Sequence, residues 1–115
     1  MKWLTHVVWG AIPFLPTMGP MAYTVASLHT AVTDVMGHWG YRRARWHDVL
    51  SVVLGVAIGL YLGNVAAGLA MGLIHVVLDW ISPGRLAVSW LYNAPFILLG
   101  AALNVYISRL TLGHA

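Results

Sequence analysis

The chain has 115 residues, of which 60% are hydrophobic and 8% charged, and about a quarter of a typical globular sequence is charged. A soluble domain this small buries at most roughly 70% of its unfolded surface, so it would leave much of this apolar area in water. The composition therefore predicts a membrane protein, and it excludes intrinsic disorder, which requires low hydrophobicity and high charge.

Two hydrophobic segments occupy the first third of the chain. The first, residues 3–18, is short and contains Pro13 and Pro16, so we expect it to end irregularly or to cross a membrane only partly. A secretory signal peptide is the alternative for this stretch, but the small-residue cleavage pattern is poor. The second helix is expected over 20–38, and the polar segment 39–48 follows it.

Three more helices are expected after this polar segment. The run 49–81 would reach about 50 Å as one helix, which is too long for a single straight span. Gly63-Asn64 predicts a turn that divides the run into a tight helical hairpin. Residues 82–84, Ser-Pro-Gly, end the fourth helix, and the fifth is expected from 93–95 to about Leu112. The fold class is thus all-α: one transmembrane domain, 1–115, of about five hydrophobic helices.

Glycines recur at four-residue spacing in the predicted hairpin: Gly55, Gly59 and Gly63, then Gly68 and Gly72. Small residues at this spacing let helix backbones approach closely. We expect these glycine faces to pack helices together, within the chain or between copies in an oligomer. The alternative is that glycine is simply tolerated in membrane helices.

The basic residues predict an orientation. When the five segments alternate in direction, Arg109 is the one basic residue near one side, and the other side carries Lys2, Arg42, Arg43, Arg45 and Arg85. By the positive-inside rule this second side is cytoplasmic, and it includes the N-terminus and the loop 39–48. Five of the six tryptophans fall at the same boundary, where aromatic belts form. Because the basic residues are few and separated by apolar runs, we expect no nucleic-acid partner.

Acidic residues are the chemically informative ones, because an ionisable group within a membrane costs about 2.5–3.5 kcal/mol. Residues four apart on a helix share a face, and carboxylates and imidazoles both bind divalent metals. All three acidic residues have a histidine close in sequence: Asp34 with His38, Asp48 with His47, and Asp79 with His75.

These pairs predict a divalent metal site that faces the cytoplasm. The metal is expected to be Zn²⁺, with Mn²⁺ as the alternative, and the absence of cysteine limits the ligands to His and Asp. Taken singly, each pair could instead be an intrahelical hydrogen bond or a helix cap. His29 is expected to point away from the site and to form a helix–helix hydrogen bond. The candidate ligands are Asp34, His38, His47, His75, Asp79 and His6.

An ordered set of short motifs accompanies these ligands: Thr5-His6, Thr33-Asp34 to Gly37-His38 with Arg42-Arg43, His47, and His75 to Asp79. In order and helical placement this set resembles the YdjM-like membrane-bound metal-dependent hydrolases, and above all their short archaeal branch. The similarity runs from residue 5 to about residue 90. It implies a metal site and hydrolytic activity.

The predicted function is therefore metal-dependent hydrolysis at the bilayer surface. Asp48 is the candidate general base, because of its position, and a lipid phosphoester held by Arg42 and Arg43 is the candidate substrate. A protein that moves protons or metal ions across the membrane is one alternative. A non-catalytic subunit of a membrane complex, in which the polar residues clamp helices together, is another.

Overall fold

The computed structural model describes residues 2–39, 42–43, 47–81 and 89–113, without the side chains of 35–47 and 111–113. This part of the chain is all-helical apart from one antiparallel pair of two-residue strands. The elements are α1 (Trp3–Gly10), η1 (Ile12–Phe14), α2 (Leu15–Met18), α3 (Met21–Gly37), β1 (His38–Trp39), β2 (Arg42–Arg43), α4 (His47–Leu62), α5 (Val65–Trp80) and α6 (Trp90–Gly113).

The first segment is irregular, as its prolines predict. Pro13 lies at the start of the 3₁₀ turn η1, and Pro16 lies in the first turn of the short helix α2. A proline donates no backbone N–H, so it is tolerated at the start of a helix and disrupts its interior. The apolar run 3–18 therefore folds as three short pieces.

The expected turn between the third and fourth predicted helices is confirmed. Gly63 adopts φ +77°, a left-handed conformation that favours glycine. Asn64 then caps α5, because its side-chain oxygen accepts a hydrogen bond from the backbone N–H of Ala67 at 3.1 Å.

Two expected boundaries are wrong. The last long helix, α6, begins at Trp90 instead of at 93–95, and Pro95 lies inside it. Ser89 explains this earlier start, because its hydroxyl oxygen accepts the backbone N–H of Tyr92 at 3.3 Å. His38, expected on the same helix as Asp34, lies beyond the end of α3 and pairs with Arg43 in the β1–β2 ladder.

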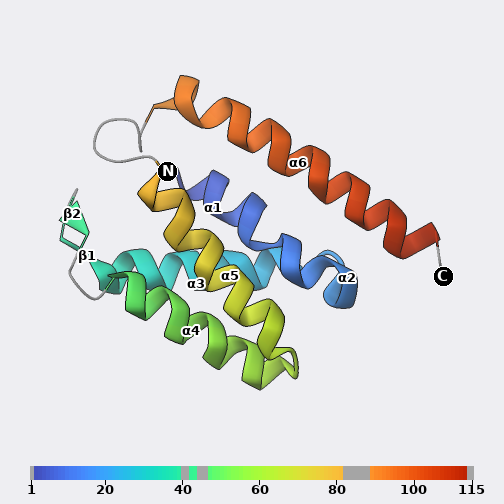
Figure 1. Cartoon of the computed structure of the whole chain (residues 1–115), viewed down its shortest axis with the longest axis horizontal. Helices are drawn as coiled ribbons and strands as arrows, with labels where there is room; N and C mark the ends of the chain where they lie inside the picture. The colour runs from blue at the N-terminus through green and yellow to red at the C-terminus, as the bar shows by residue number, and fades with distance from the viewer. Residues whose placement is uncertain (1, 40–41, 44–46, 82–88, 114–115) are drawn as a thin grey trace.

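The helix termini gather at two opposite ends of the molecule (Figure 1). The starts of α1, α4 and α6, the last turns of α3 and α5 and the β1–β2 ladder all lie in the same half of the molecule, with the ladder next to the end of α3. Helix α2, the α4–α5 turn and the last turn of α6 lie at the other end. The alternating layout therefore brings the expected site-bearing helix ends to one side.

Glycines allow α4 and α5 to pack with their backbones in contact. A Cβ atom added at Gly68 would lie 2.1 Å from the carbonyl oxygen of Gly55 and 2.8 Å from Cα of Gly59. One added at Gly72 would lie 2.7 Å from the carbonyl oxygen of Ser51. No side chain fits at these positions, so the expected close approach is confirmed within the chain.

A small apolar core and a large apolar surface complete the fold. Phe14, Met71 and Ala26 are buried between α1, η1, α3 and α5, whereas Tyr61 and Leu91 are 90% and 87% exposed. Among the described helices, only the segment Trp90–Leu110 is both long and apolar enough to cross a membrane. Helices α4 and α5 are apolar but have 16 residues each, which is about 24 Å at 1.5 Å per residue. Of the helices expected to cross a membrane, one in the described part of the chain is therefore long enough to do so.

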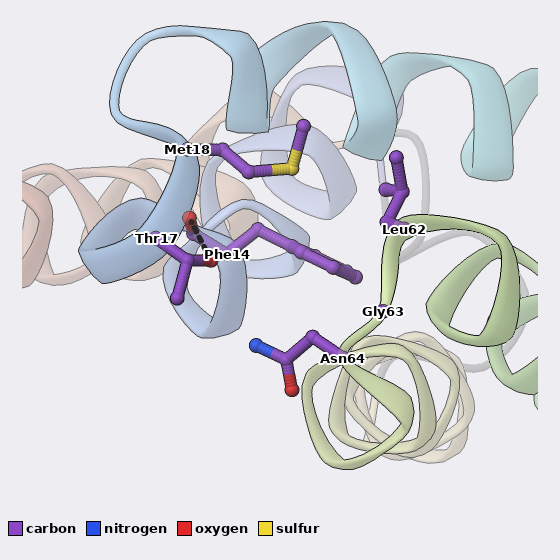
Figure 2. A pocket seen from close by; sticks show the side chains of 6 residues that line it. All are labelled: Phe14, Thr17, Met18, Leu62, Gly63 and Asn64. Atoms are coloured by element: carbon purple, nitrogen blue, oxygen red, sulfur yellow. Dashed lines mark hydrogen bonds between the residues drawn. The ribbon is translucent and has the colours of Figure 1, made fainter.

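A cavity of about 230 Å³ lies between η1–α2 and the α4–α5 turn (Figure 2). It is mainly apolar, and the side chain of Asn64 lies at its border. Helix α2 and the α4–α5 turn, which line it, lie at the opposite end of the molecule from the start of α1 and the last turn of α5. The lining residues are Phe14, Thr17, Met18, Leu62, Gly63 and Asn64.

Candidate metal centre

Three of the predicted ligands meet in the interior, where α1 crosses the last turns of α5. His6 comes from α1, and His75 and Asp79 lie one turn apart on α5. All three are buried, and one potential ligand atom from each lies within 4.8 Å of the other two. His6 Nε2 donates to Asp79 Oδ1 at 3.0 Å, and His75 Nε2 lies 3.3 Å from Asp79 Oδ2.

Asp34, near the end of α3, adds a second carboxylate. Its Oδ1 lies 3.4 Å from His75 Nε2. The side chain of Asp34 is 34% exposed, whereas those of His6 and His75 are each 2% exposed. Of these three side chains, that of Asp34 is the one most accessible from outside the protein. With Asp34, four of the six predicted ligands come together.

The two histidine rings of the cluster lie face to face. Their centroids are 4.0 Å apart and their planes are inclined by 17°. Both Nε2 atoms point toward the carboxylate of Asp79. Stacking thus places two imidazole nitrogens on the same side, next to two carboxylates.

The spacing of these atoms suits a small divalent metal. Ligands about 2.0–2.1 Å from a tetrahedral zinc ion lie about 3.3–3.4 Å from one another. The nitrogen–oxygen distances of 3.0, 3.3 and 3.4 Å fall close to this range. His6, His75 and Asp79 could hold a metal ion, with Asp34 adjacent.

No protein-family model, curated protein or solved structure matches this chain. The description of the site therefore depends on its geometry.

A buried asparagine, Asn93, fixes the helix that carries His6. Its side-chain oxygen accepts two hydrogen bonds, from the backbone N–H of Lys2 at 2.8 Å and from the hydroxyl of Thr5 at 2.7 Å. Its amide donates to the carbonyl oxygen of Ser89 at 2.7 Å. Asn93 is fully buried and ties α1 to α6 next to His6. From the sequence, Asn93 was expected only to start a helix. An amide side chain within an apolar segment is the signal that indicates a buried contact.

The predicted base, Asp48, is hydrogen-bonded to Trp80, which is not a member of the cluster. Its Oδ2 accepts a hydrogen bond from the indole N–H of Trp80 at 2.8 Å, at an exposed position. This bond connects the start of α4 to the end of α5. The side chains of four other predicted residues, His38, His47, Arg42 and Arg43, lie outside the described part of the structure.

His29 lies closer to the cluster than expected. It does form the predicted helix–helix hydrogen bond, since Nε2 donates to the carbonyl oxygen of Ser51 on α4 at 2.8 Å. However, its ring centroid is 5.5 Å from that of His75, at an interplanar angle of 80°. The expectation that His29 points away from the site is therefore wrong. That expectation compared His29 with His38 as if both lay on one helix. His38 lies beyond the end of α3, and the ring that packs against His29 is that of His75 on α5.

Proposed function

We propose that this chain is an integral membrane protein with a divalent metal site near one face of the bilayer, and that it is a metal-dependent hydrolase. The observation that carries the proposal is the buried group of His6, His75 and Asp79, with their ligand atoms within 4.8 Å of one another. Buried ionisable groups in an apolar protein need strong partners, and a metal ion is one. The motif resemblance to YdjM-like hydrolases supports the same proposal.

Two imidazoles and one carboxylate are a donor set found in catalytic zinc sites, which keep a further position open. A divalent metal bound there would lower the pKa of a coordinated water toward about 7 and polarise a substrate oxygen. Zn²⁺ suits these ligands best, and Mn²⁺ is the alternative.

Asp34 is the best-placed residue to accept a proton in this site. Its Oδ1 lies 3.4 Å from His75 Nε2, and its side chain is partly exposed. A general base must reach the attacking water, either directly or through one other water. Asp48 remains the base predicted from sequence, but its carboxylate is hydrogen-bonded to Trp80. The variants Asp34→Asn and Asp48→Asn therefore decide between the two.

The proposed substrate is a phosphoester of a lipid or of a ligand at the bilayer surface, held by Arg42 and Arg43. The support for this is positional: the β1–β2 ladder, which contains both arginines, lies at the same end of the molecule as the start of α1 and the last turn of α5, the helices that carry the proposed ligands (Figure 1). An arginine binds a phosphate through charge-assisted, often bidentate hydrogen bonds.

The metal site can be tested by elemental analysis of the detergent-purified protein. We expect about one equivalent of divalent metal per chain, its loss in His75→Ala, and its retention in His114→Ala, a histidine change at the end of the chain. Equal metal content in wild type and His75→Ala would refute the site.

Activity is tested separately, on the metal-loaded protein. The probes are bis(p-nitrophenyl) phosphate and vesicles that contain an anionic phospholipid. We expect turnover by wild type and its loss in Asp34→Asn with the metal retained. A metal-loaded wild type that hydrolyses neither probe would contradict the hydrolase assignment. Ion or proton flux in proteoliposomes would then favour the translocation alternative, and the absence of flux a structural subunit.

The membrane orientation can be tested by single-cysteine labelling, without background because the chain has no cysteine. In intact cells, a membrane-impermeant maleimide should label Tyr61→Cys, at a position that is 90% exposed and lies near the α4–α5 turn. Gly40→Cys, in the loop proposed to be cytoplasmic, should be labelled only after the cells are opened. The reverse pattern would invert the proposed orientation.

Oligomerisation through glycine-rich faces stays a prediction. Because Gly55, Gly59, Gly68 and Gly72 pack α4 against α5 within the chain, a second copy would need another face.

A further inference from the structure

A third buried histidine, His29 on α3, packs against the ring of His75, one of the proposed metal ligands. It is 1% exposed, and its ring is nearly perpendicular to the ring of His75, with the centroids 5.5 Å apart. It is not among the three residues whose ligand atoms lie within 4.8 Å of one another. His29 therefore contacts a proposed ligand without being one of this group.

The position of His29 is fixed through the backbones of two other helices. Its Nε2 donates to the carbonyl oxygen of Ser51 at 2.8 Å. The hydroxyl of Ser51 donates in turn to the carbonyl oxygen of Gly72 at 3.0 Å. Gly72 lies on α5, about one turn before His75, and it has no room for a side chain against Ser51. The carbonyl group that holds His29 is thus held against the helix that carries His75.

The ring of His75 is consequently confined by two other rings. His6 stacks on it at 4.0 Å, and His29 packs against it at nearly a right angle. Rotation of the His75 ring would collide with one or both of them, because interiors are closely packed. This confinement keeps His75 Nε2 3.3–3.4 Å from the carboxylates of Asp79 and Asp34.

We propose that His29 is a positioning residue, whose ring holds the imidazole of His75 in its metal-binding orientation and so sets the affinity of the site for divalent metal. The inference rests on the proposed metal site and assigns a role to a residue that supplies no ligand atom. Groups that orient metal ligands typically change metal affinity by about 10–100-fold when they are removed.

The test is a titration of the detergent-purified full chain with Zn²⁺, and with Co²⁺ as a spectroscopic probe. We expect His29→Ala to weaken Zn²⁺ binding about 10–100-fold, to retain the wild-type stoichiometry at saturation, and to shift the visible absorption bands of bound Co²⁺. His29→Phe, which keeps a ring in the same place, should recover most of the lost affinity. Thr30→Ala, at a neighbouring buried position on the same helix, is the matched control and should bind like wild type.

His29→Gln separates the ring from the hydrogen bond, since glutamine can still donate to the Ser51 carbonyl group. It also serves if His29→Ala does not fold. We expect His29→Gln to bind weakly, as the alanine variant does. Wild-type affinity and wild-type Co²⁺ bands in His29→Gln would overturn the proposal.

Three further results would also overturn it. Loss of metal from both His29→Ala and His29→Phe even at saturation would make His29 a ligand. A wild-type protein that binds neither Zn²⁺ nor Co²⁺ would refute the proposed metal site itself, and the role of His29 with it. Wild-type binding with no effect of His29 substitutions would refute the positioning role alone.

Discussion

Replacing Gly68 by alanine tests the close contact between α4 and α5. The added Cβ would lie 2.1 Å from the carbonyl oxygen of Gly55, and ordinary contact begins at 3.4 Å. The position of the Cβ is fixed by the backbone of α5, and the oxygen belongs to the backbone of α4, so the helices themselves must move apart. Overpacking costs about 1–3 kcal/mol, and alanine recovers up to about 1 kcal/mol through its higher helix propensity. Because 2.1 Å is far inside ordinary contact, we take the cost at its upper end, about 3 kcal/mol, and expect a net loss of about 2 kcal/mol in the free energy of unfolding.

Two other glycines complete the series. Gly72→Ala places its Cβ 2.7 Å from the carbonyl oxygen of Ser51, so we expect a smaller loss of about 1 kcal/mol. Gly10→Ala is the control, because its Cβ would make ordinary contacts of 3.5 and 3.6 Å with Ala26 and Met71. This last change should raise the free energy of unfolding by about 0.4–1 kcal/mol, because alanine restricts the unfolded chain more than glycine does.

The assay is reversible unfolding in detergent, followed by circular dichroism, with metal affinity measured on the same samples. Because α5 carries His75 and Asp79, Gly68→Ala and Gly72→Ala should also weaken metal binding. Equal unfolding free energies for Gly68→Ala and Gly10→Ala would refute the close contact. An equal loss of metal affinity in Gly10→Ala would show that the effect does not pass through the α4–α5 interface.

Three further predictions concern the contacts around the site. Asn93→Leu should destabilise the protein by about 1–3 kcal/mol and weaken metal binding, since the buried donors of Lys2 and Thr5 lose their acceptor; wild-type unfolding and metal affinity would contradict this. Trp80→Phe removes an exposed hydrogen bond to Asp48, so it should change the unfolding free energy by less than about 1 kcal/mol and leave the metal content unchanged, as elemental analysis can check. Removal of metal with a chelator should lower the melting temperature of wild type. If the free metal concentration is about 100 times Kd before removal, about 2.7 kcal/mol of stabilisation is lost. The same shift in His75→Ala would mean that the chelator does not act through the proposed site.

Local signals in the sequence predicted most of the helices. The prolines at 13 and 16 interrupt the first apolar run, and Gly63-Asn64 turns the chain between α4 and α5, as expected. The predicted start of α6, at 93–95, lies too late in the chain. It was based on Pro95 as a first-turn residue, whereas Ser89 caps the helix several residues earlier. The β1–β2 ladder was not expected, since two-residue strands leave no periodicity to read.

The sequence also indicated which residue types form the site and at which end of the molecule they lie. The residue types, His and Asp, follow from composition, and the alternating direction of the helices follows from the turn positions. Both are local properties of the chain. The tertiary structure decided which side chains meet. The contact of His6 with Asp79 depends on how α1 crosses α5, and the approach of Asp34 and His29 to His75 depends on the rotation of α3 about its own axis. Those angles are set by packing between distant segments, such as the glycine contact of α4 with α5 and the bonds of Asn93, and so no local pattern contains them.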